Sequence, residues 1–523
     1  MASKFSVSPI AMAFLAGLGS AADVLKLNAP TSLAGASIEH LPSFSPLSIE
    51  PAFWVEFVGN ASEPNELYMK LISNIVERGG QPIIRPGGNT MDSMIFDSNG
   101  GDPVRTMGTA GEVYRTTVGP AYYESWANFP DEVLFISTLN FGNDSLQIAQ
   151  DLAVASVKYQ AERVKSFELG NEPNWYPSTR WNYSTDNYVS QWKNWTASID
   201  QAIDTAAEEE NIAFPDTRWV ASSATTDDAS IQIRPVNIIP AGIDSENQVQ
   251  QYSIHSYVYN TCSAAGAAIS TIENLLNHTR IITFAVERVL PSATAALESG
   301  KQWIMGEFNS VACSGKPNVT DTFTQALWVI DTELTYATLN ASSVHLHQGA
   351  TLVLQSSTQT NTPGYSAYSW VYPRDSDKWG EARALPSYAA MLFLAEVFAQ
   401  PKTRVLSLEA AQGVDQDRFS AYATYVDDKL SKIILLNLEP YYSNSTSDFT
   451  INLDISEFLP AGNASASVKR LTAPSVDEQD TSQVLWAGQS FKYGDASGNL
   501  TIEKVSASKI VNIRGSEAIL VEL

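Results

Sequence analysis

The sequence predicts an α/β protein: a (β/α)8 TIM barrel, followed by a C-terminal β-sandwich domain that an N-terminal segment completes. Three observations lead to this fold class. Eight short apolar runs alternate with helical patterns through the middle of the chain, as parallel strands and crossover helices do. After Pro401 the pattern changes to short alternating strands separated by Asn, Ser and Gly residues. The 523 residues also exceed the roughly 250 that a typical barrel of this kind needs.

The chain is expected to begin with a secretory signal peptide over residues 1–22. Lys4 supplies a short positive region, residues 10–18 are mostly apolar, and the small residues 19–22 are typical of a cleavage site before Asp23. A buried N-terminal segment is the alternative interpretation. The other predicted parts are one or more sandwich strands over 23–38, the barrel over 39–400 and the sandwich over 401–523.

The barrel strands are predicted from apolar runs of strand length. In chain order these runs are 48–57, 82–85, 133–140, 166–170, 219–223, 252–257, 302–306 and 344–348. Helical patterns lie between most of them, at 66–78, 146–163, 185–207, 271–297 (as one helix or two), 322–339 and, after the last strand, 387–398. The sandwich strands are expected at 418–426, 432–438, 449–453, 467–471 and 510–513, with a further contribution from 24–37.

The composition excludes two classes of partner. Acidic residues outnumber basic ones by 57 to 32, which gives a formal net charge of −25. Nucleic acid is therefore not expected as a partner, because binding its phosphates requires clustered Lys and Arg. A membrane span is not expected either, because no stretch approaches 18 uninterrupted apolar residues. With the predicted signal peptide, these features indicate a secreted, extracellular protein. Its ten N-x-S/T sequons fit glycosylation, at Asn60, Asn143, Asn182, Asn194, Asn277, Asn318, Asn340, Asn444, Asn463 and Asn499.

A glutamate follows the predicted fourth strand directly. Residues 167–174 read Phe-Glu-Leu-Gly-Asn-Glu-Pro-Asn, so an apolar strand runs into Asn171 and Glu172. Active sites of barrels lie at the C-terminal ends of the strands. Asn171 can hydrogen-bond a sugar hydroxyl there, and Pro173 ends the strand because it cannot continue the ladder. A surface turn carrying an ordinary solvated glutamate is the alternative.

A second glutamate stands at the end of the predicted seventh strand. Residues 302–309 read Gln-Trp-Ile-Met-Gly-Glu-Phe-Asn, which places Glu307 across the barrel mouth from Glu172. Two carboxyl groups about 5 Å apart permit glycoside hydrolysis with retention by double displacement. In that chemistry Glu307 is the nucleophile and Glu172 the acid/base, whose pKa must be raised by burial and by its ionised partner.

The two cysteines, Cys262 and Cys313, follow the predicted sixth and seventh strands closely. In an oxidising compartment an even count favours one disulfide, which here would join two neighbouring loops at the barrel mouth. Two free thiols are the alternative. No metal site is expected at His345 and His347, because no Cys or Asp cluster accompanies them, and no cofactor is implied. His255, beside the mouth, is better interpreted as a hydrogen-bonding partner of an active-site residue.

The chain resembles glycoside hydrolase family 79, the β-glucuronidases and heparanase-like enzymes, and within it the secreted fungal type. Besides the two glutamate motifs, the resemblance rests on Ser-Ile-Glu at 48–50, Arg-Pro-Gly-Gly-Asn-Thr at 85–90, His-Ser-Tyr at 255–257, His-Gln-Gly at 347–349 and Pro-Gly-Tyr at 363–365. It implies an exo-acting retaining β-glucuronidase that removes terminal β-linked glucuronic acid, or its 4-O-methyl form, from glycans such as arabinogalactan. The substrate contacts that it implies are Glu50, Asn89, Asn171, Tyr257, Gln348, Gly364 and Tyr365.

Within that resemblance, Gly364 and Tyr365 match the segment that holds the glucuronate carboxylate, through a backbone N–H and a phenol. The family sometimes places a Lys beside this segment, whereas here residues 366–368 are Ser-Ala-Tyr. Two other functions were weighed against exo-cleavage. Heparanase-like endo-cleavage is disfavoured because the chain has no basic cluster to hold a polyanion. A non-catalytic carbohydrate-binding homologue is disfavoured because both glutamates and Asn171 are present.

Overall fold

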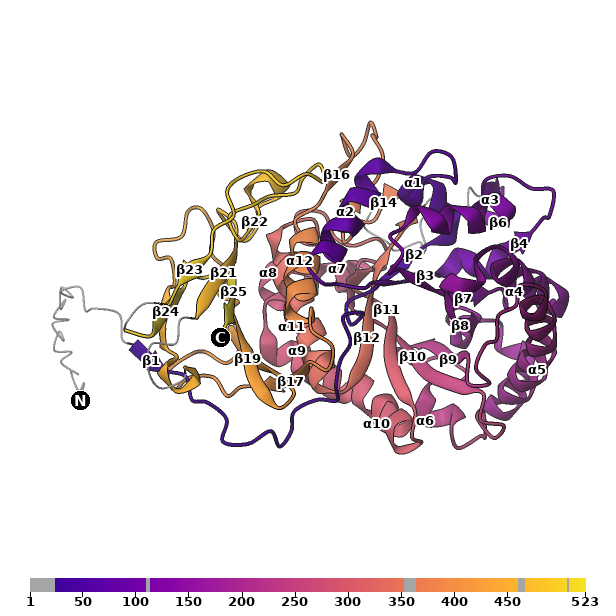
Figure 1. Cartoon of the computed structure of the whole chain (residues 1–523), viewed down its shortest axis with the longest axis horizontal. Helices are drawn as coiled ribbons and strands as arrows, with labels where there is room; N and C mark the ends of the chain where they lie inside the picture. Colours follow the sequence, from indigo (N-terminus) through magenta and orange to yellow (C-terminus); the bar gives the residue numbers. More distant parts are fainter. Residues whose placement is uncertain (1–23, 110–112, 352–363, 460–465, 506–507) are drawn as a thin grey trace, which may run out of the picture.

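The computed structural model describes residues 24–109, 113–351, 364–459, 466–505 and 508–523. The predicted signal peptide at 1–22 and the Asn463 sequon lie outside the described residues. A barrel forms one side of the molecule and a strand-rich domain the other (Figure 1). In the ranges that are described, no helix is long and apolar enough to cross a membrane.

Eight parallel strands close into a barrel in chain order, which confirms the predicted (β/α)8 fold. Each of the eight predicted runs supplies one barrel strand. The strands are β2 (Leu47–Ile49), β3 (Ile83–Pro86), β7 (Leu134–Leu139), β8 (Val164–Leu169), β9 (Trp219–Thr225), β10 (Val249–Asn260), β11 (Gln302–Ala312) and β12 (Ala341–Gln348). Glu172 therefore follows the fourth strand, and Glu307 lies on the seventh.

The first barrel strand is much shorter than the predicted run 48–57. After Ile49 the chain enters a 3-10 helix (Pro51–Phe53) and then α1 (Trp54–Val58). Pro51 explains the change, because its ring fixes φ at a helical value and it has no N–H for the ladder. The apolar side chains that suggested a longer strand are buried all the same, since Trp54, Phe57 and Val58 face the core from the helix.

The predicted helices between the strands are present, with one exception. They are α2 (Glu66–Glu77), α4 (Leu146–Gln160), α5 (Thr185–Glu209), α11 (Phe323–Thr338) and α12 (Tyr388–Val397). The run 271–297 is instead broken into α8 (Ile272–Leu275), α9 (His278–Phe284), a π-helical turn (Ala285–Val289) and α10 (Leu290–Glu298). Asn277 caps α9 by accepting from Arg280 N at 2.9 Å, and Pro291, which lacks an N–H, follows the π turn.

The C-terminal domain contains two sheets. The larger has the order β17 (Arg404–Ser407), β18 (Phe419–Val426), β19 (Lys429–Asn437), β25 (Glu517–Glu522), β21 (Ser467–Thr472) and β22 (Leu485–Trp486), with β23 (Glu503–Lys504) beside β21. The smaller contains β1 (Val24–Lys26), β20 (Ile451–Asp454) and β24 (Ile510–Ile513). β1 pairs parallel with β20, so the N-terminal segment does add a strand to this domain. Apolar residues of both sheets form a separate core between them.

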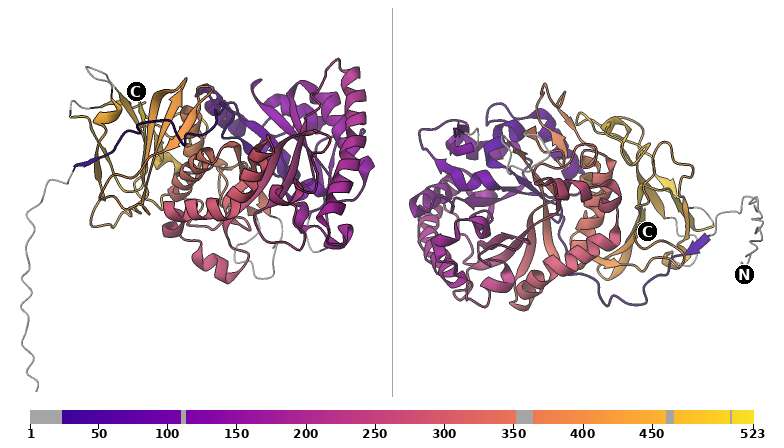
Figure 2. Two further views of the ribbon diagram at one scale, coloured as in Figure 1. Left: turned by 90° about the horizontal axis from the view of Figure 1, so that it is seen from below. Right: turned by 180° about the vertical axis from the view of Figure 1, so that it is seen from behind.

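The barrel and the C-terminal domain share a continuous apolar core. Tyr422, Leu436 and Leu520 of the larger sheet belong to the same buried cluster as the residues of α11 and α12. One face of the larger sheet thus packs on these two helices, and its other face packs on the smaller sheet (Figure 2). Polar contacts cross the same junction, including Lys469 Nζ to Glu396 Oε2 at 2.7 Å.

Candidate active site

A cavity of about 790 Å³ opens where the barrel strands end. Side chains from the ends of seven of the eight strands, or from the residues just after them, line it. They are Glu50, Asn89, Glu172, Thr225, Tyr257, Glu307 and His347. This is the face of a (β/α)8 barrel on which catalytic groups are found.

Glu172 reaches the cavity from a sharp turn after β8. Gly170 has φ +87° and Glu172 has φ +48°, so the backbone reverses within three residues. The turn is held by the backbone N–H of Glu172, which donates to Ser223 O at 2.9 Å, and by that of Asn171, which donates to Asp92 Oδ2 at 3.2 Å. The Glu172 side chain is 16% exposed, and its Oε1 lies 3.2 Å from His255 Nδ1.

Glu307 projects into the same cavity from β11 and is held by two donors. Tyr257 donates its phenolic O–H to Oε1 at 2.9 Å, and Arg85 donates from Nη1 to Oε2 at 3.0 Å. The residue before it, Gly306, packs closely against β10, since a Cβ there would stand 2.1 Å from Ser253 Oγ. Both oxygens of the Glu307 carboxyl group therefore have a fixed orientation.

Arg85, fully buried at the end of β3, links the polar groups beneath the cavity. Besides Glu307, its guanidinium donates to Glu168 Oε1 at 2.6 and 2.8 Å, to Asn171 Oδ1 at 3.0 Å and to Ser48 Oγ at 3.0 Å. The planar fork of arginine allows one side chain to serve several acceptors in this way. Gly87 leaves room for it, since a Cβ there would stand 2.5 Å from the guanidinium carbon.

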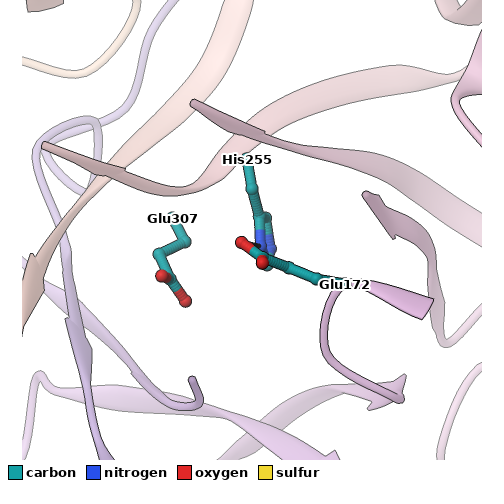
Figure 3. A group of neighbouring side chains, drawn as sticks. All are labelled: Glu172, His255 and Glu307. Atoms are coloured by element: carbon teal, nitrogen blue, oxygen red, sulfur yellow. Dashed lines mark hydrogen bonds and ion pairs between the residues drawn. The ribbon is translucent and has the colours of Figure 1, made fainter. Parts of the chain in front are cut away.

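The carboxyl groups of Glu172 and Glu307 face each other across the cavity. One oxygen of each, and one ring nitrogen of His255, all lie within 4.8 Å of one another (Figure 3). This spacing is that of retaining glycosidases, in which the second carboxyl group is close enough to attack the sugar directly. It leaves too little room for the water that inverting enzymes place between the two groups.

The two carboxyl groups have opposite pKa shifts. Burial and the negative charge of Glu307 raise the pKa of Glu172 well above its ordinary value. Burial also favours a raised pKa for Glu307, but the neighbouring His347, His255 and Arg85 and the hydrogen bond from Tyr257 outweigh it, so the pKa of Glu307 is lowered. Glu172 is thus suited to hold a proton while Glu307 is ionised.

His255 is held in its neutral form. Burial, together with the positive charge of Arg85, lowers the pKa of its imidazole well below the ordinary value. His255 then adds no positive charge beside the Glu307 carboxylate, whereas Arg85 and Tyr257 donate hydrogen bonds to it. Glu172, His255 and Glu307 are close enough to offer ligands to a cation, but the Glu307 oxygens already accept from Arg85 and Tyr257, and the Arg85 charge would repel a metal ion.

Comparison with known proteins gives matches to glycoside hydrolases. Residues 421–520, within the C-terminal domain, match the model described as the glycosyl hydrolase family 79 C-terminal beta domain. Two curated relatives, both named β-glucuronidase, match most of the chain. The one from Aspergillus niger is 26% identical over 93% of this chain and 90% of its own length; the one from Neurospora crassa is 25% identical over 79% and 75%. The chain is thus similar to β-glucuronidases over most of its length, and to glycoside hydrolase family 79 in its C-terminal domain.

Other comparisons agree with the barrel architecture. Residues 143–345, which include both glutamates, match the cellulase model of glycosyl hydrolase family 5. Among solved structures, a 4-O-α-L-rhamnosyl-β-D-glucuronidase from Fusarium oxysporum has a TM-score of 0.75 at 21% identity, covering 96% of this chain and 99% of its own. A family 51 α-L-arabinofuranosidase from Bifidobacterium longum has a TM-score of 0.58 at 14% identity, covering 96% and 100%. At these identities the likeness shows the fold alone.

Several of the residues expected to contact substrate do line the cavity. Glu50, Asn89, Asn171 and Tyr257 are all there. Glu50 is oriented by Thr90, which donates to its Oε1 from both the backbone N–H and the hydroxyl. A Cβ on the adjacent Gly88 would collide with the Glu50 carboxyl group, so the Gly-Gly pair makes room for both Arg85 and Glu50.

Gln348 is not among the residues that line the cavity. Its side chain is fully buried, with Oε1 accepting from Trp370 N at 3.0 Å and Nε2 donating to His347 O at 3.0 Å. The preceding residue, His347, occupies the cavity wall instead, between Glu50 and Glu307 at 3.7 Å from each. The residue of this strand that can reach a substrate is thus His347, one position before the expected Gln348.

Gly364 and Tyr365 lie next to the cavity wall rather than in it. Tyr365 pairs with Ala350, which does line the cavity, and its ring packs against Phe57 and Tyr372. The sequence places no Lys directly after this segment, but the fold brings Lys378 to it: a Cβ on Gly364 would stand 3.4 Å from Lys378 Nζ. A positive charge is therefore present beside the Gly-Tyr segment.

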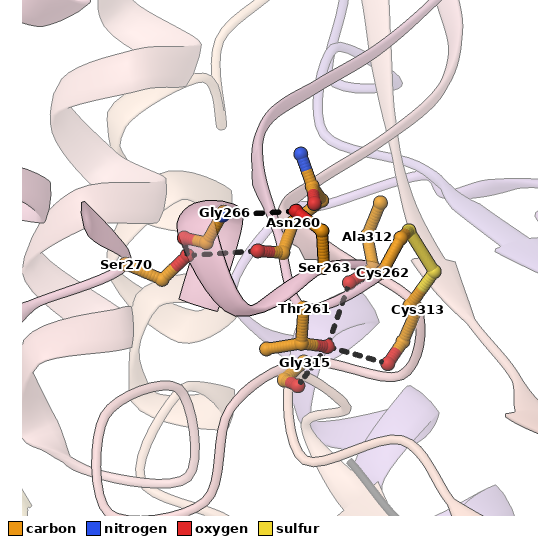
Figure 4. The surroundings of a disulfide bond; sticks show 9 residues. All are labelled: Asn260, Thr261, Cys262, Ser263, Gly266, Ser270, Ala312, Cys313 and Gly315. Atoms are coloured by element: carbon orange, nitrogen blue, oxygen red, sulfur yellow. Dashed lines mark hydrogen bonds between the residues drawn. A yellow bond between two sulfur atoms is a disulfide. The ribbon is translucent and has the colours of Figure 1, made fainter. Parts of the chain in front are cut away.

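Cys262 and Cys313 form a disulfide at the rim of the cavity, with an S–S distance of 1.99 Å. It joins the residues that follow β10 to those that follow β11 (Figure 4). Thr261 strengthens the same link, because its hydroxyl donates to Cys313 O at 2.9 Å and its backbone N–H to Ala312 O at 3.1 Å. The strands that carry Tyr257 and Glu307 are thereby tied together just beyond the site.

Sequence reasoning missed three groups at the site. Arg85 was part of a quoted motif, but no role was assigned to it. Asp92 accepts from Asn171 N and lines the cavity, and Trp175 lines it three residues after Glu172. An arginine at the end of an otherwise apolar barrel strand could have identified Arg85, because a buried cation needs carboxylate partners. For Asp92, which lies in a 3-10 helix after β3, no sequence signal was available.

Proposed function

We propose that this hydrolase is a retaining exo-β-glucuronidase that removes terminal β-linked glucuronic acid, or its 4-O-methyl form, from glycans such as arabinogalactan. The pair of glutamates within 4.8 Å of each other, with opposite pKa shifts, carries the proposal. The choice of sugar is supported by the two curated relatives, both of which are named β-glucuronidase.

In the proposed first step, a Glu307 carboxylate oxygen attacks the anomeric carbon while Glu172 gives its proton to the glycosidic oxygen. The bond to the leaving sugar breaks and a glycosyl ester on Glu307 forms. Asn171, whose Oδ1 is already bound by Arg85, is positioned for its Nδ2 to contact the sugar 2-hydroxyl.

In the second step, Glu172 removes a proton from water, which attacks the anomeric carbon and releases Glu307 as a carboxylate. The change of role follows from the charges. Once Glu307 is esterified it no longer carries the negative charge that raises the pKa of Glu172. The pKa of Glu172 therefore falls, so the carboxylate left by the first step stays ionised and can accept a proton from the attacking water.

The proposed contact for the glucuronate carboxylate is the segment Gly364–Tyr365, with Lys378 as a nearby positive charge. The position of Lys378 Nζ beside Gly364 supports this assignment. An extended polyanion is a poorer fit. Five acidic residues line the described part of the cavity, whereas Arg288 is the one arginine or lysine among these lining residues. The acidic residues are Glu50, Asp92, Glu172, Asp227 and Glu307. This balance supports exo-cleavage of a single terminal sugar over heparanase-like endo-cleavage.

The experiment that tests this function compares p-nitrophenyl β-D-glucuronide with the corresponding β-D-glucoside and β-D-xyloside at mildly acidic pH. Selective release from the glucuronide is expected, with Glu307→Gln inactive as the control. Preference for a neutral sugar would overturn the substrate assignment while keeping the two-glutamate chemistry. No release from any of the three, with shortening of heparan sulfate chains, would favour the endo-acting alternative.

We also propose that the protein is secreted. The signal-like sequence before Asp23 supports this, as does the Cys262–Cys313 disulfide, because such bonds persist in oxidising compartments. N-terminal sequencing of protein from the culture medium should give a chain that begins close to Asp23. Retention of the protein inside the cells with residues 1–22 intact would contradict the proposal.

A further inference from the structure

Trp175 differs from the other tryptophans of the chain. All twelve lie in the described ranges, and Trp175 is the one that is largely exposed, with 55% of its surface accessible. It also lines the cavity. An exposed indole offers a ligand a large apolar face together with an N–H donor at its edge.

The turn that carries Trp175 is held firmly in place. Its backbone N–H donates to Glu172 O at 2.9 Å. The buried Asn174 makes two hydrogen bonds with Thr225 at the end of β9, donating from Nδ2 to Oγ1 at 2.9 Å and accepting from the backbone N–H at 3.2 Å. Pro173 fixes the backbone at the start of the turn. The indole is thus presented at a constant place relative to Glu172.

The side of the cavity on which Trp175 lies is that of the leaving group. The acid/base residue must reach the glycosidic oxygen, so the leaving sugar lies beside Glu172. Glu307 instead lies on the opposite face of the sugar ring that is being cleaved off the glycan. Asp227 and Arg288 line the same side: the charge of Asp227 contributes to the raised pKa of Glu172, and Arg288 in turn acts on Asp227.

We infer that Trp175, Asp227 and Arg288 form a binding site for the leaving group, which takes a neutral pyranose ring. The apolar face of the pyranose stacks on the indole, and its hydroxyls hydrogen-bond the Asp227 carboxylate and the Arg288 guanidinium. A neutral sugar fits because the Asp227 carboxylate on this side of the cavity would repel an acidic one. The identity of the sugar on the other side of the cleaved bond rests on the proposed function, whereas the position of this binding site does not.

The test compares two substrates that share the glucuronyl group. Glucuronyl fluoride loses only fluoride, which cannot contact Trp175, whereas a glucuronosyl-galactose disaccharide loses a pyranose. Truncating a tryptophan that is a binding hot spot costs about 2 kcal/mol or more, so in Trp175→Ala the ratio of kcat/KM for disaccharide to that for fluoride should fall about 30-fold. Trp175→Phe, which retains an aromatic ring, should recover part of the loss.

A second measurement tests the same site with an acceptor sugar in place of the leaving group. The glycosyl ester on Glu307 can be attacked by a sugar hydroxyl instead of water, which forms a new glycoside. With glucuronyl fluoride as donor and methyl β-D-galactoside as acceptor, Trp175→Ala should transfer less and hydrolyse more than wild type. The control is Tyr183→Ala, which removes an aromatic that is 63% exposed but does not line the cavity; it should leave both the ratio and the partition unchanged.

An equal loss of activity on fluoride and disaccharide, or no change in either, would overturn the inference. Its failure is distinguishable from that of the proposed function. If wild type cleaves the glucosyl fluoride and glucosyl-galactose pair in place of the glucuronyl pair, the sugar assignment fails, and the same comparison on the glucosyl pair decides the role of Trp175. If wild type cleaves neither pair, both are rejected.

Discussion

The Arg85 guanidinium touches four side chains that belong to three barrel strands or their ends. Two of them, Glu168 and Glu307, are acidic, and the buried guanidinium forms an ion pair with each, at 2.6 and 3.0 Å. Through Asn171 and Glu307 it also fixes two groups that the proposed mechanism uses. We therefore interpret Arg85 as a positioning residue that also sets the charge of the nucleophile.

Replacing Arg85 by lysine should raise the pKa of Glu307. A single ammonium group cannot reach all four acceptors, so the hydrogen bond to Glu307 or those to Glu168 and Asn171 are lost. We expect kcat/KM to fall about 100-fold or more, as when one aligned donor is removed from an active site. The acid limb of the pH profile of kcat/KM should move to higher pH.

The matched control for this prediction is Arg404→Lys, since Arg404 pairs with the exposed Asp428 in the C-terminal domain. That variant should show a wild-type profile. An unshifted acid limb in Arg85→Lys, with only the rate reduced, would mean that Arg85 affects geometry and not the charge of Glu307.

The pH profile of the wild type should be bell-shaped. Activity requires Glu307 ionised, and because its pKa is lowered, activity should persist well into the acid range before that limb falls. It also requires Glu172 protonated, and because its pKa is raised, the basic limb should fall only as pH rises through that raised value. In Glu172→Ala, hydrolysis of glucuronyl fluoride should lose the basic limb, and added azide should give glucuronyl azide.

Persistence of the basic limb in Glu172→Ala would assign that titration to another group. The azide product provides an independent check, because a small anion can attack the glycosyl ester without a general base. Its anomeric configuration should be β, as expected for a second inversion at the same carbon.

At the scale of single residues, some of the site could be predicted and some could not. Glu172 and Glu307 were found because each follows an apolar strand. Gln348 was expected to contact substrate, whereas His347 lines the cavity; successive strand residues point to opposite faces, so only one of the two could reach it. The role of Arg85 depends on Gly87 leaving space beside it, and no property of the local sequence reveals that contact.

At the scale of elements, the prediction was best where a pattern is long and weakest where proline intervenes. The eight strands were located from apolar runs, and the long helices from their period. The first strand was extended through Pro51 into α1 because buried helical residues there are as apolar as those of a strand. Short runs of this kind do not distinguish the two.

The disulfide is the element-scale feature with the clearest consequence. Cys262 and Cys313 join the extensions of β10 and β11 that carry Tyr257 and Glu307. The double variant Cys262→Ser/Cys313→Ser should lose about 2–4 kcal/mol of unfolding free energy, as for closure of a loop of this size. Because the link lies at the cavity rim, we also expect kcat/KM to fall.

Denaturant unfolding and initial rates would check this prediction, with wild type treated with dithiothreitol as the control for reduction without substitution. The double variant and the reduced wild type should show the same loss of stability and of rate. Unchanged rates together with reduced stability would limit the disulfide to a role in folding.

At the scale of the whole molecule, a buried polar group joins the barrel to the C-terminal domain. His278, at the start of α9, contacts Asp331 Oδ2 of α11 through Nδ1 at 2.9 Å, and Tyr422 of β18 donates to Asp331 Oδ1 at 2.7 Å. Burial lowers the pKa of His278, but the charge and hydrogen bond of Asp331 outweigh it, so the pKa is raised. The protonated form is therefore favoured in the folded state.

A raised folded pKa gives a defined dependence of stability on pH. The contribution of His278 should be complete below its unfolded pKa of about 6.5 and should be lost as pH rises through the raised folded value. We expect His278→Asn to cost about 1–3 kcal/mol at pH 5.5, as for a hydrogen bond to a charged group, and less at pH 8.5. Urea unfolding of both proteins at the two pH values would measure this.

A difference between His278→Asn and wild type that grew with pH would contradict the expected sign. Asp331→Asn provides a second check, because it removes the charge that raises the pKa of His278. In that variant the dependence on pH attributed to His278 should disappear.

The pairing of β1 with β20 has a consequence for synthesis on the ribosome. Val24 pairs with Asn452, which is made 428 residues later. At roughly 5–20 residues per second, the first strand waits about 20–90 s for its partner, while the whole barrel emerges and can fold. During that interval β1 is an unpaired strand, open to association with other chains. Its length of three residues and its Lys26 limit that hazard.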